Sequence, residues 1–297
     1  MRAELARRFR AVLSGSPTGV PAWTDQILAG DDLGHFGPAD APWVVHADLA
    51  TMIGGIRALL LQALHPGSLA GVAQHSRYES AALERLAGTI RWLTIATFGS
   101  KQALQIESER VNGMHGQVRG KYRSADGAER SYSATDSDLL LWVHIAFTDS
   151  FLRAHQTFGA QPIPGGADAY VGPWGVVVEP LGLRTTPGSL AELEAQIAQF
   201  QPILRVDERT ARVVEFIKRP PLPGAGRIIY RLLFAAALTT LSEPHRQLLG
   251  LRVRTARVVV PVTKLLLFAL RKLLGPSSPL EEAALARRER LQRLAAQ

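Results

Sequence analysis

The chain has 297 residues, of which 46% are hydrophobic and 20% charged, so it can bury a sizeable core and is not a disordered protein. It contains no cysteine. This excludes disulfides, thiolate nucleophiles, zinc–sulfur sites and iron–sulfur clusters, and any metal must be held by histidine or oxygen ligands. The net charge of +8 comes almost wholly from arginines that are not gathered into one stripe with interleaved aromatic residues, so we expect no nucleic-acid partner.

The N-terminal sequence MRAELARRFRAVLSG is basic and amphipathic, but it lacks the apolar stretch of a secretory signal. A membrane span needs ~20 apolar residues with few charges. The two most apolar stretches fail this test, because one carries Asp48 and Arg57 and the other is interrupted by Pro261 and Lys264. Together with the absence of cysteine, this predicts a cytoplasmic protein, and association with a membrane surface stays open.

Residues 1–45 are predicted to form an irregular arm after a first short helix, because they are rich in proline and glycine. We expect Trp23, Phe36 and Trp43 to anchor this arm onto the body of the protein.

The next predicted helix runs from Ala47 to Leu64 and is stopped by Pro66. It contains Gly54 and Gly55, each of which costs ~1 kcal/mol relative to alanine in the middle of a helix. Such a pair is usually kept for the close approach of a neighbouring helix, and less commonly for a ligand.

Capping residues and apolar spacing predict further helices along the rest of the chain. Residues 122–136 contain an Asp-Gly step and little apolar content, so we expect a loop or a small β-hairpin there. Residues 159–188 are rich in proline and glycine, with a short strand-like run at Val176–Val178. The predicted helices are 68–76, 80–98, 100–120, 137–158, 189–201, 208–218, 227–242 and 246–274, the last of them broken or kinked by prolines.

These elements predict an all-α fold with at most a minor β-hairpin in the loops. We expect a single multi-helix domain over residues 46–275, followed by a charged surface helix over residues 276–297.

Two helices are predicted to carry histidines on apolar faces. On the first, His115 shares a face with Leu104, Val111, Val118 and Tyr122, and Arg119 lies one turn beyond it. On the second, the face consists of Leu140, His144, Phe147, Phe151 and His155.

One histidine on an apolar face is more often a hydrogen-bonded core residue than a ligand. Two such helices with flanking arginines, and no His-x-x-x-His or Glu-x-x-His spacing, favour one histidine bound to a large flat cofactor over a metal held by several ligands. A haem needs this combination: one imidazole on iron, apolar walls, and arginines for the propionates.

Arg85 and Thr89 are one turn apart on the predicted 80–98 helix and face the same way. Over a pocket they would offer a charged donor and a hydroxyl to bound oxygen or substrate. The alternative, that Arg85 pairs with a surface carboxylate, is equally compatible with the spacing.

Four motifs in order, ALHPGSLAGVAQHS, ERLAGT, RVNGMHGQVRGKY and DSDLLLWVHIAFTDSFLRAHQTFG, resemble the family of rubber oxygenase (latex-clearing protein) and the mpaB-type oxygenases. The resemblance extends from Trp43 to Gly159. It implies an all-helical fold with a core likened to the globins, and b-type haem as the cofactor.

The resemblance also implies roles for particular residues. His115 matches the proximal iron ligand and Arg119 the arginine one turn later, while Arg85 and Thr89 match the distal helix. Gly88 stands where the family has a basic residue, which leaves rubber cleavage itself in doubt and the substrate unspecified. Residues at three further family positions are expected to support the pocket: His65, Ser76 and His144.

The function that these observations favour is a haem-dependent, oxygenase-like oxidoreductase for an apolar substrate such as a lipid or terpenoid. In it His115 binds iron, Arg119, His144 and Phe147 contact the cofactor, and Arg85 and Thr89 face the oxygen-binding side. The substrate is expected to approach along Trp92, Phe147 and Phe151.

Two alternatives stay open. One is a non-catalytic haem carrier or gas sensor, which Gly88 supports. The other is a cofactor-free helical protein that associates with membranes through the basic, apolar segment RVRTARVVVPVTKLLLFALRKLLG. Such peripheral membrane contact is also compatible with the haem functions.

Overall fold

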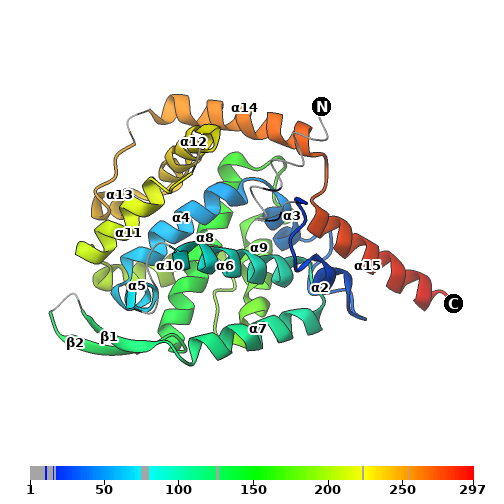
Figure 1. Cartoon of the computed structure of the whole chain (residues 1–297), viewed down its shortest axis with the longest axis horizontal. Helices are drawn as coiled ribbons and strands as arrows, with labels where there is room; N and C mark the ends of the chain where they lie inside the picture. Colours follow the sequence, from blue (N-terminus) through cyan, green and yellow to red (C-terminus); the bar gives the residue numbers. More distant parts are fainter. Residues whose placement is uncertain are drawn as a thin grey trace.

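The computed structural model describes residues 11, 16, 18–74, 80–124, 127–222, 224–253 and 255–297, without the side chains of 72–74, 80–85 and 225. Nearly all of the predicted N-terminal helix therefore lies outside the described residues, as do Ser76 and the side chain of Arg85. The all-α fold is confirmed: the described chain contains fourteen α-helices, two short 3-10 helices and one two-stranded sheet (Figure 1).

Two helices, α4 (Thr51–Leu64) and α8 (Ser137–Phe158), form the centre of the fold. They approach closely at Gly54, where a Cβ atom would lie 2.6 Å from Phe151 Cδ1 and 3.1 Å from Phe151 Cα. The predicted use of this glycine for helix packing is confirmed. Gly55 has no comparable neighbour, since a Cβ atom there would meet nothing within 4 Å.

Most of the other helices pack around this pair and share one continuous hydrophobic core with it. The helices in contact with α4 or α8 are α3 (Ala41–Ala47), α5 (Pro66–Gln74), α9 (Gly166–Trp174), α10 (Leu190–Phe200), α11 (Glu208–Lys218), α12 (Gly224–Thr240) and α14 (Ala256–Leu274). The remaining elements are α2 (Thr24–Leu28), α6 (Ser80–Phe98), α7 (Lys101–His115), α13 (Glu243–Leu248), α15 (Pro279–Ala295), η1 (Gly175–Leu181) and η2 (Gln201–Ile203).

A buried ion pair joins three of the central helices. Arg57 on α4 lies 2.6 Å from the carboxylate of Asp149 on α8, and it donates to Ser150 Oγ at 2.8 Å. Its Nε donates to the carbonyl of Thr240 on α12 at 3.2 Å. Burying a charge is costly unless it is paired and hydrogen-bonded, and here the guanidinium of Arg57 meets both conditions.

The Pro- and Gly-rich segment that follows α8 contains more structure than predicted. The prediction of a strand-like run at Val176–Val178 is wrong, because these residues belong to the 3-10 helix η1. The preceding residues form α9, which buries Tyr170 and Trp174. Burial of two large aromatic side chains offsets the poor helix propensity of the glycines and of Pro173.

The helix predicted over 100–120 ends at His115, five residues early, so the shared helical face with Val118 and Tyr122 is wrong. A two-residue turn leads into strand β1 (Arg119–Arg123), which pairs antiparallel with β2 (Glu129–Ser133). The predicted small hairpin is thereby confirmed. The strand forms because Val118 and Tyr122 pack against α5, where Cβ atoms at Gly71 and Gly67 would lie 3.5 Å and 3.1 Å from them.

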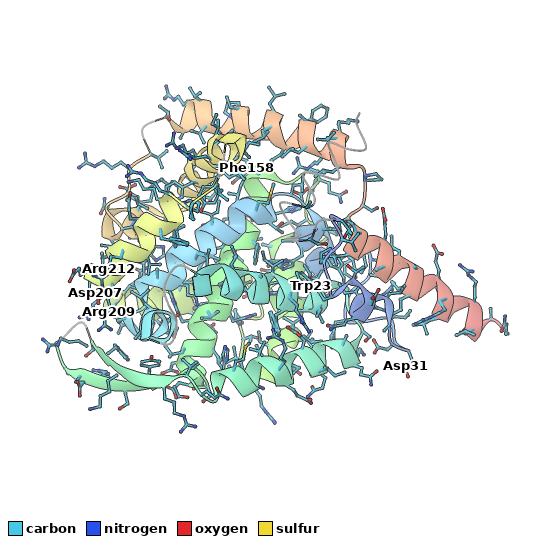
Figure 2. The ribbon with its side chains drawn as sticks, in the orientation of Figure 1. Trp23, Asp31, Phe158, Asp207, Arg209 and Arg212 are labelled. Carbon is cyan, nitrogen blue, oxygen red and sulfur yellow. The ribbon has the colours of Figure 1, made fainter. Side chains whose placement is uncertain are left out.

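The N-terminal arm is anchored by the three predicted aromatic residues. Trp23 (labelled in Figure 2) donates to Thr94 Oγ1 on α6 at 2.9 Å. Phe36 stacks on Trp174, and Trp43 meets Phe98 edge to face with 4.8 Å between ring centroids.

The C-terminal helix α15 packs by its first turns against α2 and α6 and then projects from the body (Figure 1). Arg287 on this helix is fully buried and donates to the carbonyls of Ile27 and Phe98, the latter at 2.8 Å. One side chain near the end of the chain thus holds both the arm and the end of α6.

No single described helix is long and apolar enough to cross a membrane. The pair α3 and α4, bent by 94°, passes such a test by length and composition alone, and both helices are largely buried in the core.

Candidate functional site

The candidate site is built on the helical hairpin of α6 and α7. The turn between them is tight: Gly99 admits no side chain, since a Cβ atom would lie 2.5 Å from the carbonyl oxygen of Ile95. Ser100 then caps α7, and its Oγ accepts a hydrogen bond from the Ala103 amide at 3.0 Å. The predicted start of this helix at Ser100 is confirmed.

A buried carboxylate fixes the two helices of the hairpin to each other. Glu107 on α7 lies 2.9 Å from Arg91 on α6 and 2.5 Å from Arg110 on its own helix. Beside this cluster, Trp92 Nε1 on α6 donates to Ser108 Oγ on α7 at 3.3 Å. The carboxylate of Glu107 is buried, while its two arginines are about a third exposed.

These contacts set the register of the hairpin. The helices are antiparallel and diverge from the turn at Gly99 (Figure 1). Both rise 1.5 Å per residue, so the contact between Trp92 and Ser108 places His115, seven residues further on, level with position 85. Thr89 lies one helical turn nearer the contact. The predicted proximal and distal positions are therefore at the same end of one hairpin.

The remaining predicted residues are arranged differently. His115 and Thr89 are both half-buried, but Arg119 is exposed on strand β1 and not on the helix of His115, so the predicted one-turn spacing between them is wrong. Among the described residues α6 packs against α2, α3, α7 and α15, and not closely against α8.

His144 is nevertheless an unusual core histidine. It is buried on α8, and its Nε2 has no hydrogen-bond partner among the described residues. Burial lowers the pKa of His144 to about 4, so the ring is neutral at physiological pH. A buried polar atom without a partner is costly and is found where a ligand or an ordered water completes the site. Phe147, one turn further on, is also buried and contacts Phe151.

Two other predicted histidines have structural roles. His65 Nδ1 accepts hydrogen bonds from the amides of Gly67 and Ser68 at 3.1 and 3.3 Å, which caps the start of α5. Burial lowers the pKa of His65 to about 4. His155 Nε2 lies 2.9 Å from the carbonyl oxygen of Gln161 and donates to it. Each is the hydrogen-bonded core histidine that the alternative interpretation expected.

A further buried histidine, His46 on α3, was not predicted from the sequence. Its Nε2 lies 3.2 Å from the hydroxyl of Tyr170, and its ring stacks on Trp174 with 4.1 Å between centroids. Burial lowers the pKa of His46 to about 3. Its partners lie more than a hundred residues away in the chain, so no local spacing could have revealed them.

The surface hollows of the described residues lie away from His115 and Thr89. No group of three potential metal ligands occurs among the described residues. Two surface hollows, of about 270 and 520 Å³, do not include His115 or Thr89. The first is lined by Lys218, Arg219, Pro220, Pro221, Leu222, Arg227, Tyr230 and Arg231. The second is lined by His35, Phe36, Ala39, Asp40, Ala41, Pro42, Pro164, Ala169, Pro173 and Val176.

A family model for oxygenase catalytic domains matches residues 43–274, which include the central helices and the whole α6–α7 hairpin. The chain belongs to this family, described as ER-bound oxygenase mpaB/B'/Rubber oxygenase, catalytic domain. No curated protein and no solved structure matches the chain, so the likeness of its core to the globins stays a prediction.

Proposed function

We propose that this chain is a haem-dependent oxygenase that acts on an apolar substrate. The family supplies the oxygenase class. The observation that carries the haem proposal is the register of the hairpin, which places His115 level with position 85 and one turn beyond Thr89.

The donor set suits haem better than a metal held only by protein. A haem iron needs one axial imidazole, whereas a structural or catalytic metal site needs three or four protein ligands. His115 would hold the iron through one ring nitrogen, and Arg119 and Arg85 would provide positive charge for the propionates. When bound, haem supplies redox-active iron for reactions of dioxygen.

The protein residues would then define the two sides of the site. Thr89 and Arg85 would offer a hydroxyl and a charged donor from α6. His144, neutral and with Nε2 unpartnered in the described residues, offers a single polar contact in an otherwise apolar wall that includes Phe147. Trp92 and Phe151 are the apolar side chains that we expect to receive the hydrocarbon part of a substrate.

The test of cofactor binding is the absorption spectrum of protein expressed with ample iron and haem precursor. We expect a Soret band that is lost in His115→Gly and restored by added imidazole, because free imidazole can occupy the vacated ligand position. His35→Gly, which removes another half-buried histidine far along the chain, is the matched control and should keep the band. A Soret band unaltered in His115→Gly would disprove the assignment.

The test of catalysis is oxygen consumption with apolar candidates such as polyisoprenes, terpenoids and unsaturated lipids. Arg85→Leu and Thr89→Val should keep the Soret band and lower oxygen uptake at least ~10-fold, the range for loss of one preorganised polar group. If haem-loaded protein consumes no oxygen with any of them, the catalytic part of the proposal fails.

The lack of a basic side chain at Gly88 favours one second candidate, a haem carrier or gas sensor. The family has a basic residue at this position, and a Cβ atom at Gly88 would meet nothing within 4 Å. The space therefore admits a lysine. If Gly88→Lys confers oxygen consumption on a protein that otherwise shows none, the natural chain is a carrier.

A further inference from the structure

One face of helix α14 is apolar and open to solvent. The helix buries Thr263, Leu267 and Leu270 against the body. The opposite face carries four large apolar side chains spaced three or four residues apart, which we call the α14 stripe. Its members and their exposed fractions are Val258 (60%), Val262 (45%), Leu265 (68%) and Phe268 (56%).

Such a stripe is unusual on a soluble protein. Isolated exposed apolar residues are normal, but a contiguous apolar patch marks a surface for a partner or a membrane. The helical period aligns all four members along one line of the helix. In Figure 1, α14 runs along an outer edge of the molecule, and Figure 2 shows its side chains projecting away from the body.

The charged residues of α14 are all basic. Glu243 is the only acidic residue between Phe216 and Leu280, and α14 itself has none. Arg257 and Lys264 are exposed beside the stripe and form no ion pair within the described chain. Lys272, near the C-terminal end, lies over the ring of Phe268.

Arg271, the second of the two arginines on this helix, contacts the body instead of solvent. Arg271 turns toward the body, where it pairs with Asp48 at 2.6 Å and donates to the carbonyl of Phe158 at 2.8 Å. Phe158, labelled in Figure 2, is the last residue of α8. The buried side of α14 is thus held in place by specific polar contacts, so the outer face keeps a fixed orientation.

We propose that the α14 stripe docks this protein on the surface of an anionic lipid bilayer. The helix axis would lie parallel to the membrane, with the stripe in the boundary between headgroups and acyl chains and the cations against lipid phosphates. This orientation requires a helix at the surface with apolar residues on its outer face and cations beside them, which is the arrangement of α14. It is independent of haem and brings the chain to the phase in which apolar molecules dissolve.

The observations favour a bilayer over a protein partner because of this charge distribution. Protein interfaces have a core depleted of charge with a rim of mixed polar groups, whereas every charged residue of α14 is basic. Anionic lipid supplies both an apolar layer and a dense negative surface. A second copy of the chain would place the same cations opposite one another, which costs energy.

The absence of cysteine makes a site-specific test available. Leu265→Cys, labelled with an environment-sensitive fluorophore, should blue-shift when vesicles of phosphatidylcholine and phosphatidylserine are added to the full chain. Ile106 on α7 is as exposed as Val258, at 60%, so labelled Ile106→Cys is the matched control and should not shift. A shift of equal size at both positions would overturn the proposal.

Vesicle flotation measures the contribution of each feature. Leu265→Ser/Phe268→Ser should reduce partitioning onto phosphatidylserine vesicles at least ~10-fold, whereas Ile106→Ser/Leu294→Ser should leave it unchanged. Arg257→Ser and Lys264→Ser should each reduce it about five-fold, and 1 M salt should reduce it further. All the replaced side chains are exposed, so each variant should fold, and circular dichroism checks this.

Three outcomes would overturn the proposal. The first is a full chain that floats with neither phosphatidylserine-containing nor pure phosphatidylcholine vesicles. The second is flotation that the stripe variant leaves unchanged. The third is a dimer in size-exclusion chromatography that the stripe variant converts to a monomer without any flotation, which would assign the stripe to a second copy of the chain.

Discussion

The α4–α8 pair and the α6–α7 hairpin are held together by the same kinds of bonds, yet in very different surroundings. In α4–α8 an arginine and a carboxylate are both buried, and the backbones meet at a glycine. In the hairpin the carboxylate of Glu107 is buried but its arginines are partly hydrated, and Ile106 and Met114 are exposed. The α4–α8 pair is thus a closely packed platform for the fold. The α6–α7 hairpin carries His115, the candidate iron ligand, at the end remote from its turn.

The largest effect that would distinguish them is loss of the buried carboxylate of Asp149. Asp149→Ala leaves Arg57 buried without its counter-charge and should lower the free energy of unfolding by about 3–5 kcal/mol. Glu194→Ala removes the exposed carboxylate that pairs with Arg153, which also binds Asp149, and should cost less than about 1 kcal/mol. Urea denaturation measures both, and equal losses would contradict the contrast.

Acid should destabilise the fold through four histidines that burial keeps neutral, His46 on α3, His65 at the end of α4, His144 on α8 and His245 on α13. Burial lowers the pKa of His46 to about 3 and of His65, His144 and His245 to about 4, from an ordinary value of 6.5. The unfolded chain therefore binds more protons between pH 4 and 6.5, so stability is full above pH 6.5 and falls below it. Each histidine should contribute about 1.4 kcal/mol of loss between pH 7.5 and 5.5.

Denaturant midpoints measured from pH 7.5 to 5.5 check this expectation. Stability that stays constant over this range would mean that these rings are hydrated in the native protein. Replacement of His144 by glutamine should make the pH dependence shallower.

Substitution of the two neighbouring glycines of α4 tests how closely α4 and α8 approach each other. Gly54→Ala places a methyl group against Phe151 and should cost about 1–3 kcal/mol. Gly55→Ala meets open space, and should stabilise the protein by about 0.5–1 kcal/mol through helix propensity. If both substitutions shift the melting temperature in the same direction, the packing at Gly54 is not as close as described.

In the α6–α7 hairpin, loss of the buried carboxylate of Glu107 should lower the free energy of unfolding by less than loss of Asp149 does. Glu107→Gln keeps the shape of the side chain and removes its charge, so it should cost about 1–2 kcal/mol, moderated by hydration of Arg91 and Arg110. Glu109→Gln, on the exposed side of α7, is the control and should be neutral. If haem is bound, Glu107→Gln should also release it faster to apomyoglobin, and unchanged release would separate the hairpin from the cofactor site.

Much of the fold follows from local sequence signals. The bounds predicted for the helix at 208–218 are those of α11, where Asp207 provides a capping box, and the end of α8 at Phe158 is also correct. Those signals lie within a few residues of each other. In contrast, α9 forms among glycines and prolines because Trp174 is buried by partners far along the chain, such as Phe36.

The candidate site was only partly predictable for the same reason. His115 and Thr89 could be proposed because a helix brings residues of fixed spacing to one face. The end of α7 could not, since Val118 and Tyr122 fit a helical spacing and an alternating strand equally well. Packing of β1 on α5 decides between them, and this contact joins residues about fifty positions apart.

The position of Arg287 has a consequence for the synthesis of the protein. Its guanidinium binds the carbonyls of Ile27 and Phe98, so two early segments obtain their last hydrogen-bond donor from a residue ten positions before the end of the chain. Those segments emerge from the ribosome first but cannot be completed until α15 has also emerged. The arm and the end of α6 therefore complete their hydrogen bonding only after α15 has been synthesised.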